Sequence, residues 1–394
     1  MRRFETSIKE LMKAKTEYSI KHGNEPIFLS NWDSDFSSVT IPEYNYNLTQ
    51  KEVQKYYYLT DEINNKQYFY EFYNRNFKGE LDNNCFTIAP NGTSCLMLSL
   101  MAFKEMGLNN VLVTTPVYFS TLNLLDELNY NVERLDLNYK NNFIIDSEKF
   151  EAIIKVKNTQ IFIVTNPLFG VGIELSDNDI KTISNICNKY DVWFVMDYIY
   201  GGLPWYTSNL LNYVFNNEIY DAIRISHKHI FIESISKRIF INGVKTALLF
   251  TTNEFLRRIL RISVFTIGSM SATQAKIVNE LYSIYNTDSI IESISKNALN
   301  AKRNYNKISA ILKNSDIMIS NSSCGYFSLI SAPKSEKNID DIEYAINILN
   351  KTGILTTPHS RYLFEYNNYY SFRVNLLLDE YELINGIIRI KNLI

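Results

Sequence analysis

Six short apolar runs that alternate with helix-like segments are the feature that most limits how this chain can fold. Each run is long enough for one buried strand and is rich in Val, Ile, Leu and Phe. The runs are residues 85–90, 111–116, 160–167, 192–200, 229–236 and 246–252. The helical patterns are residues 93–106, 118–129, 178–190 and 254–262. This alternation predicts an α/β fold in which a mostly parallel sheet is sandwiched by helices.

The pattern changes in the last third of the chain. A long helical stretch covers 272–313, and strand-like segments follow at 326–332 and 372–378. Helical patterns lie near 338–351 and at the C-terminal end. This mixture is typical of a smaller α+β domain.

The length of 394 residues also favours more than one folding unit, because one small core cannot accommodate it. Few Pro or Gly residues interrupt the chain, so we expect the units to be continuous. The expected parts are an N-terminal segment (1–40) that packs with the small domain, a large cofactor-binding domain (41–290) and a small C-terminal domain (291–394).

Charge and cysteine usage exclude several functional classes. A formal net charge of −2 predicts no broad basic face, so nucleic acid is not an expected partner. The cysteines lack the spacing of a metal site or a disulfide framework, which favours a reducing cytoplasm. They are Cys85, Cys95, Cys187 and Cys324. No apolar segment suits a signal peptide or a membrane span.

Several polar residues follow the predicted strands, where ligands bind in open parallel sheets. They are Asn166, Asp197, Tyr200, Ser234, Ser236 and Lys237. Each has an ordinary alternative when taken alone, such as an Asn-Pro turn for Asn166 or a cap for Asp197. Their order and spacing favour a common site.

Lys237 stands after a strand in the serine-rich segment ESISKRIFINGVKTA. A neutral lysine amine forms a Schiff base with a carbonyl cofactor, and its flexible stem lets it return as a proton carrier. An isolated lysine would instead be interpreted as a solvated surface residue. Gly243 and Lys245, six and eight positions further on, favour the catalytic interpretation.

The segment PNGTSCLMLSLMAF begins a helix directly after a strand. Gly92, Thr93 and Ser94 there present backbone N–H groups and hydroxyls at a helix N-terminus, which is a ready site for an anion. Without the other motifs, an ordinary N-cap would be the favoured interpretation.

The motif S-x-S-K, with a glycine and a basic residue at those spacings, resembles the cofactor-lysine signature of class I and II aminotransferases. These are the aspartate-aminotransferase-like enzymes of fold type I that depend on pyridoxal 5′-phosphate (PLP). The resemblance implies a Schiff base on Lys237, with Ser234 and Lys245 on the cofactor phosphate. The family usually has arginine where this chain has Lys245, which cannot form the bidentate fork of a guanidinium.

Other segments match the family in order, and the resemblance spans about residues 85–375. In TNPLFGVGIEL and MDYIYGG it implies that Asn166 and Tyr200 bind the ring 3′-oxygen and that Asp197 pairs with the pyridine nitrogen. In TTPVYFS it implies that Tyr118 stacks on the ring. In FRVN it implies that Arg373 binds the substrate carboxylate. Gly92, Thr93 and Ser94 match the phosphate-binding turn.

Two segments depart from the family pattern. FLSNWDSDFSS has Asn31 and Trp32 where a backbone glycine would lie, which leaves the substrate open. The tyrosine segment YYYLTDEINNKQYFYEFYNRN has lost its glycine, so Tyr57 or Tyr58, with Tyr58 preferred, is the candidate to reach the phosphate of a partner subunit.

No second arginine for a substrate side-chain carboxylate can be assigned, although Arg261 and Arg361 are candidates. Structural roles are favoured for His227 and His229.

The resemblance implies an aminotransferase that moves an amino group between an L-amino acid and a 2-oxo acid. A PLP-dependent lyase, decarboxylase, cyclase or oxidase on the same scaffold stays open, because fold alone does not select the reaction. A non-catalytic PLP-binding regulator is a minor alternative. The resemblance also implies a homodimer with shared active sites and no metal.

Overall fold

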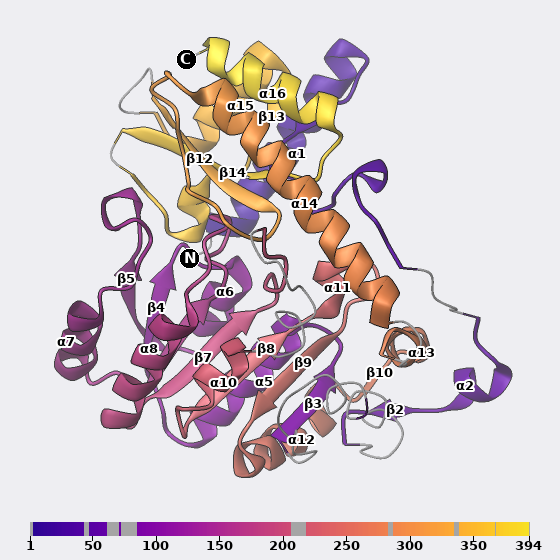
Figure 1. The fold of residues 1–394 in the computed structure, drawn as a ribbon, viewed down its shortest axis with the longest axis vertical. Helices are drawn as coiled ribbons and strands as arrows, with labels where there is room; N and C mark the ends of the chain where they lie inside the picture. The colour runs from indigo at the N-terminus through magenta and orange to yellow at the C-terminus, as the bar shows by residue number, and fades with distance from the viewer. Residues whose placement is uncertain are drawn as a thin grey trace.

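A seven-stranded sheet forms the centre of the larger part of the molecule (Figure 1). The computed structural model describes residues 3–42, 47–60, 71, 85–205, 218–282, 287–334, 339–366 and 368–393. In these residues the strand order is β3-β9-β8-β7-β6-β4-β5. The strands are β3 (Phe86–Ala89), β4 (Asn110–Thr115), β5 (Asn131–Asp136), β6 (Ile161–Thr165), β7 (Trp193–Tyr198), β8 (His229–Glu233) and β9 (Ala247–Thr251).

Helices cover both faces of this sheet, and every residue of β6 and β8 is therefore buried. One contacting group is α5 (Gly92–Glu105), α6 (Phe119–Glu127) and α12 (Asn253–Thr266). The other is α7 (Ser147–Lys157), α8 (Asp177–Lys189) and α10 (Glu218–Ile223). Helix α8 begins after its N-cap Ser176, whose hydroxyl accepts from Asp179 N. The expected α/β fold with a mostly parallel sheet is confirmed.

Only β9 runs against the other strands of the sheet. The carboxyl ends of β6 and β7 therefore meet, with Thr165 opposite Asp197. Because β9 is reversed, its first residues lie beside the last residues of β8, with Leu248 opposite Glu233. Ala89 at the end of β3 pairs with Ala247. One edge of the sheet thus collects the ends of β3, β6, β7 and β8 and the start of β9.

A second, three-stranded antiparallel sheet of β11 (Met318–Ile319), β12 (Phe327–Pro333) and β14 (Tyr369–Asn375) lies above this edge in Figure 1. It is flanked by α14 (Thr287–Leu312), α15 (Asp341–Thr352) and α16 (Glu380–Leu393). The remaining short elements are β13 (Ile354–Leu355), the 3-10 helix η4 (His359–Tyr362), and β10 (Ser269–Met270), which pairs with β2 (Tyr57–Tyr58).

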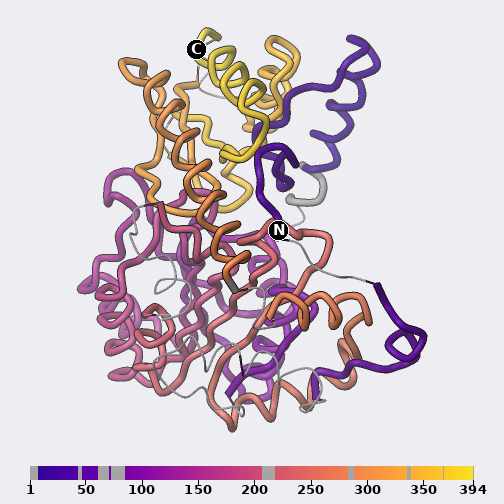
Figure 2. Tube along the Cα trace, turned by 45° about the vertical axis from the view of Figure 1, so that its right-hand side comes forward, coloured from indigo at the N-terminus to yellow at the C-terminus, as the bar shows by residue number. Residues whose placement is uncertain are grey.

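The N-terminal segment lies beside these C-terminal elements (Figure 2). Helix α1 (Arg3–His22) contacts α15, and β1 (Ile27–Phe28) pairs in parallel with β13. These contacts agree with the expected packing of residues 1–40, while the exact domain bounds stay a prediction.

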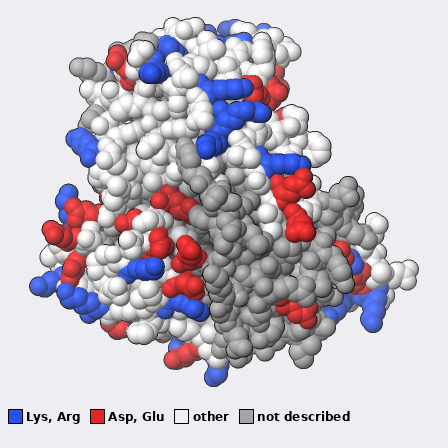
Figure 3. All heavy atoms as spheres, in the orientation of Figure 1, with Lys and Arg blue, Asp and Glu red and all other residues white. Residues whose placement is uncertain are grey.

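Two sequence expectations differ from the structure. The helical stretch 272–313 contains two helices, α13 (Ala272–Leu281) and α14, rather than one. Strand β5 and helix α7 were not expected, because NVERLD alternates poorly and its residues are mostly exposed at the sheet edge. No described helix is both long and apolar enough to cross a membrane. Acidic and basic side chains both occur on the face shown in Figure 3.

Gly172, in the loop after β6, lies against the backbone of β12 in the second sheet. This contact can be tested by substitution. Its φ is +73°, and an added Cβ would lie 2.4 Å from the carbonyl oxygen of Phe327. Gly107 has φ +75° but open space around the same position. Both alanine variants should lose about 1–2 kcal/mol from left-handed strain. Gly172→Ala should lose about 1–3 kcal/mol more from overpacking. Equal losses in chemical unfolding would contradict this packing.

Candidate active site

A cavity of about 710 Å³ opens at the carboxyl edge of the central sheet. Eight residues that the sequence predicts for the site line it: Gly92, Thr93, Tyr118, Asp197, Tyr200, Ser234, Lys237 and Lys245. They come from strand ends and helix starts that the reversed β9 brings to one edge. This is the usual position of a ligand site in an open α/β sheet.

Lys237 lies on the short helix α11 (Ile235–Arg238), directly after β8. Its Nζ donates to Asn242 Oδ1 at 2.9 Å and lies 5.8 Å from the centre of the Tyr200 ring. Burial, followed by the nearby charge of Lys245, lowers the pKa of Lys237 to about 8. A sizeable fraction of this amine is therefore neutral and nucleophilic near physiological pH.

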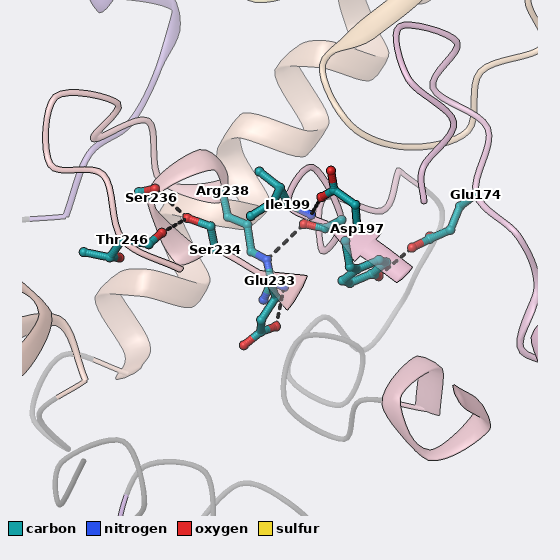
Figure 4. A network of polar contacts seen from close by, with 10 residues as sticks. Glu174, Asp197, Ile199, Glu233, Ser234, Ser236, Arg238 and Thr246 are labelled. Atoms are coloured by element: carbon teal, nitrogen blue, oxygen red, sulfur yellow. Dashed lines mark hydrogen bonds and ion pairs between the residues drawn. The ribbon is translucent and has the colours of Figure 1, made fainter. Parts of the chain in front are cut away.

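A buried ion pair fixes the turn that carries Lys237 (Figure 4). Arg238 Nη2 lies 2.7 Å from Glu233 Oε2, and Arg238 Nε donates to the carbonyl of Gly201 at 2.9 Å. Both charged side chains are almost fully buried, so removing either partner would leave an uncompensated charge. Sequence reasoning missed this pair. The sequence feature that could have indicated this pair is a glutamate at the end of an apolar run, five residues before an arginine.

The serines of this turn are held by local hydrogen bonds. Ser234 Oγ donates to the carbonyl of Thr246 at the start of β9, and it lies 2.6 Å from Ser236 Oγ (Figure 4). These bonds tie the end of β8 to β9. Ser234 thus faces the cavity with its hydroxyl already engaged by the protein.

Asp197 is an acid without a described cationic partner. Its Oδ1 accepts from the backbone N–H of Ile199 at 3.1 Å, and the cavity reaches its side chain. Desolvation raises its pKa to about 6, and the Ile199 hydrogen bond opposes that effect. A bound cation or protonated ring nitrogen would relieve this cost by pairing with the carboxylate.

The N-terminus of α5 forms another wall of the cavity. Asn91 caps this helix by accepting from Ser94 N at 2.8 Å, while Gly92 and Thr93 line the cavity. A Cβ on Gly92 would lie 2.6 Å from Ile199 Cδ1, so the close approach of these segments requires glycine. The helix N-terminus and the exposed Lys245 together suit an anion. Ser94 does not line the cavity, and its hydroxyl bonds to Asn91.

Arg373, on β14, is fully buried and does not line the cavity. Its Nη1 donates to Tyr362 Oη and its Nη2 to the carbonyl of Ser30, each at 3.0 Å. The guanidinium carbon lies 3.5 Å from the centre of the Trp32 ring, and Trp32 lines the cavity. A carboxylate that reaches Arg373 from the cavity must therefore pass the indole ring.

The remaining predicted residues lie outside the cavity wall. Asn166 is buried, and its Oδ1 accepts from Leu175 N at 2.9 Å. Tyr58 lies on β2 with 42% of its surface exposed. Arg261 forms an ion pair with Glu105, and neither Arg261 nor Arg361 lines the cavity. The assigned roles of Asn166 and Tyr58 stay predictions.

Several lining residues were not assigned to the site from the sequence, among them Trp32, Asp33, Phe119, Ser120 and Asn242. The unusual loop FLSNWDSDF was the available signal for the first two. Asn242 precedes the glycine of the lysine motif, but its bond to Lys237 depends on the turn geometry. Phe119 and Ser120 gave no signal beyond their nearness to Tyr118.

Comparisons with known proteins agree with this geometry. The family model "Aminotransferase class I and II" matches residues 45–390. An aspartate aminotransferase from Musicola paradisiaca (strain Ech703) is 21% identical over 185 residues, which are 47% of this chain and 44% of that protein. The match thus spans less than half of that curated relative.

Two solved structures illustrate the similarity of fold. Aspartate aminotransferase from Thermus thermophilus with maleate has a TM-score of 0.81 at 15% identity, covering 100% of this chain and 99% of that one. YbdL from Escherichia coli, identified as having a methionine aminotransferase function, has a TM-score of 0.78 at 15% identity and covers 97% of both chains. These likenesses confirm the fold-type I architecture.

The raised pKa of Asp197 has a measurable effect on stability without a bound ligand. The protonated form is favoured in the folded protein, so this contribution is fully present below about pH 4 and is lost as pH rises through about 6. Asp197→Asn should therefore stabilise the ligand-free protein at pH 7 by about 2–3 kcal/mol, with a gain that shrinks toward pH 4. Unfolding measured across this pH range checks it. Asp126→Asn, an exposed change, is the control, and a gain independent of pH would contradict the explanation.

Proposed function

This chain belongs to the class I and II aminotransferases, and we propose that it transfers an amino group between an L-amino acid and a 2-oxo acid with pyridoxal 5′-phosphate as cofactor. The observation that carries the proposal is the cavity in which the buried amine of Lys237 and the unpaired carboxylate of Asp197 meet. Burial disfavours the charged form of each group, and each group can bind one functional group of this cofactor.

The residues present fit the cofactor. Asp197 offers an anion for the pyridine nitrogen, and no cation of the described residues offsets the effect of burial on its pKa. The N-terminus of α5 and Lys245 offer positive charge for the phosphate. Tyr118 and Tyr200 supply aromatic walls. When bound, the cofactor supplies an electron sink that stabilises negative charge at the substrate Cα.

Lys237 is the residue that would hold the cofactor aldehyde and then move a proton. Its lowered pKa, about 8, allows the amine both to accept and to release a proton near neutral pH. Asn242 holds the free amine inside the cavity by accepting its hydrogen bond. Burial, followed by the charge of Lys245, keeps the pKa of Lys237 low, and the Arg238–Glu233 pair keeps the turn in place.

Arg373 would bind the substrate α-carboxylate. Its guanidinium has two neutral hydrogen-bond partners, and no carboxylate of the described residues forms an ion pair with it. A buried cation without a counter-ion favours an incoming anion, and a carboxylate fits a guanidinium well. Trp32 stands beside the route, so movement of the indole ring is part of substrate entry in this proposal.

We also propose a homodimer. The arm formed by α2 (Gln50–Gln54) and β2 projects from the body in Figure 1 and exposes Val53, Tyr56 and Tyr58 at 62%, 68% and 42%. A contact with a second subunit would cover these apolar side chains. The scattered cysteines of the sequence favour a reducing compartment, and we propose the cytoplasm.

A half-reaction assay tests the transamination. The purified protein, loaded with PLP, should convert its cofactor to the amino form when given a suitable amino acid and no oxo acid. Borohydride should fix the cofactor on Lys237, as located by peptide mapping. Lys237→Ala should abolish both results, while Lys181→Ala, an exposed ion-paired lysine on α8, should preserve them. Decarboxylation or elimination without conversion of the cofactor would overturn the assignment.

Substitution of Arg373 should weaken binding of the substrate, whereas substitution of Lys245 should weaken binding of the cofactor. Arg373→Lys keeps the charge but loses the fork, and loss of about 1.5–3 kcal/mol should raise the substrate KM about tenfold or more while PLP stays bound. Lys245→Ala should release PLP on dialysis, and excess PLP should restore part of the activity by mass action.

Lys245→Arg restores the residue that the family usually has and is the matched control. PLP titrations followed by kinetics at saturating cofactor measure both effects. If Arg373→Lys loses PLP while Lys245→Ala retains it, the two roles have been exchanged.

A further inference from the structure

Asp33 is a charged residue in the cavity wall that the proposed mechanism does not use. It follows Trp32 in the loop after β1, and its carboxylate has no hydrogen bond or ion pair with another described side chain. Its negative charge nevertheless acts inside the cavity, where it opposes the lowering of the pKa of Lys237. Asp33 therefore presents an available anion to whatever occupies this space.

Hydrogen bonds hold the backbone around Asp33 in place, which limits the space that its exposed carboxylate can reach. Asn375 Nδ2, at the end of β14, lies 3.2 Å from the carbonyl of Asn31 and 3.3 Å from that of Asp33. Asp35 N donates to the carbonyl of Leu377 at 2.8 Å. The loop is thus attached to the same strand that carries Arg373, the proposed anchor of the α-carboxylate.

The charged residues of the cavity wall indicate which substrate side chains Asp33 would favour. The charged lining residues are Asp33, Asp197, Lys237 and Lys245. Under the proposed function, the cofactor occupies the last three through its nitrogen, aldehyde and phosphate, and the α-carboxylate occupies Arg373. Asp33 is then the remaining charge among the described lining residues. An acidic substrate side chain would be repelled, whereas a cationic one would be paired.

The neighbouring walls suit the rest of such a side chain. Trp32, which precedes Asp33, and Phe119, whose ring centre lies 6.3 Å from that of Trp32, both line the cavity. Their apolar rings can pack against a methylene stem whose charged end binds a polar group. The cavity volume of about 710 Å³ is in the range of sites that hold a cofactor and a small substrate. Apolar walls with one acidic residue are a suitable environment for an extended cationic side chain.

We propose that the amino donor carries a positively charged side chain, an ammonium or a guanidinium on an aliphatic stem, and that Asp33 is the residue that selects it. The inference rests on the proposed transamination and adds its substrate class. It also separates this chain from a preference for a second carboxylate, because neither candidate arginine lines the cavity.

The test compares amino donors in the half-reaction of the PLP-loaded enzyme. Lysine and arginine should exceed norleucine, which has a neutral stem of similar length, by about tenfold or more in kcat/KM. They should exceed aspartate by more, and the preference should weaken at high salt. Equal or better use of norleucine or aspartate would overturn the inference.

Two variants test whether Asp33 is the residue that favours a cationic side chain. Asp33→Asn should remove most of the preference for lysine over norleucine, measured as the ratio of their kcat/KM values. Asp35→Asn changes a carboxylate of the same loop that bonds to Ser37 N and does not line this cavity, so it should keep the preference. An equal fall for all donors in Asp33→Asn would show that Asp33 acts on Lys237 rather than on the substrate, and would overturn the proposal.

Binding distinguishes this inference from the proposed function. If no amino acid converts the cofactor, transamination is refuted, and calorimetry with the same amino acids then measures selection directly. Tighter binding of lysine than norleucine, lost in Asp33→Asn, would still support the role of Asp33. Equal affinities would refute it.

Discussion

The reversed strand β9 is the constraint on which the site depends. Strands β6, β7 and β8 end at one edge of the sheet, and β9 begins there because it runs in the opposite direction. The hydrogen bond from Ser234 to the carbonyl of Thr246 joins the two segments at this edge. Lys237 and Lys245, eight residues apart, therefore face one cavity, although a helix or a strand over the same span would separate them.

The charges at this edge are arranged for a ligand rather than for the stability of the empty protein. Two lysines stand near each other, and an aspartate stands without a cation. Burial moves the pKa of each group toward its neutral form, and the charge of Lys245 adds to this effect for Lys237. A ligand group of opposite charge would remove these costs, so relief of the unfavourable electrostatics would contribute to the free energy of ligand binding.

The sequence was sufficient for the main strands and for eight lining residues, because apolar runs and residues at strand ends are local signals. It was insufficient where a contact depends on tertiary placement. The bond from Lys237 to Asn242 depends on the turn after α11, and Trp32 meets Arg373 across more than 300 residues. Helix α13 ends at Leu281, although the sequence pattern was interpreted as helical from 272 to 313. Asn166 was expected at the cavity, but its side chain satisfies the backbone of Leu175.

The buried ion pair of Arg238 and Glu233 constrains how these two positions can change during evolution. Loss of one partner alone would leave a charge in a dry interior at a cost of about 3–5 kcal/mol, whereas replacement of both by apolar residues of similar volume is nearly neutral. Substitutions at the two positions are therefore viable chiefly in combination. Across descendants of a common ancestor, the residue after Lys237 and the residue at the end of β8 should have changed together, which makes these positions a lineage marker that is independent of substrate.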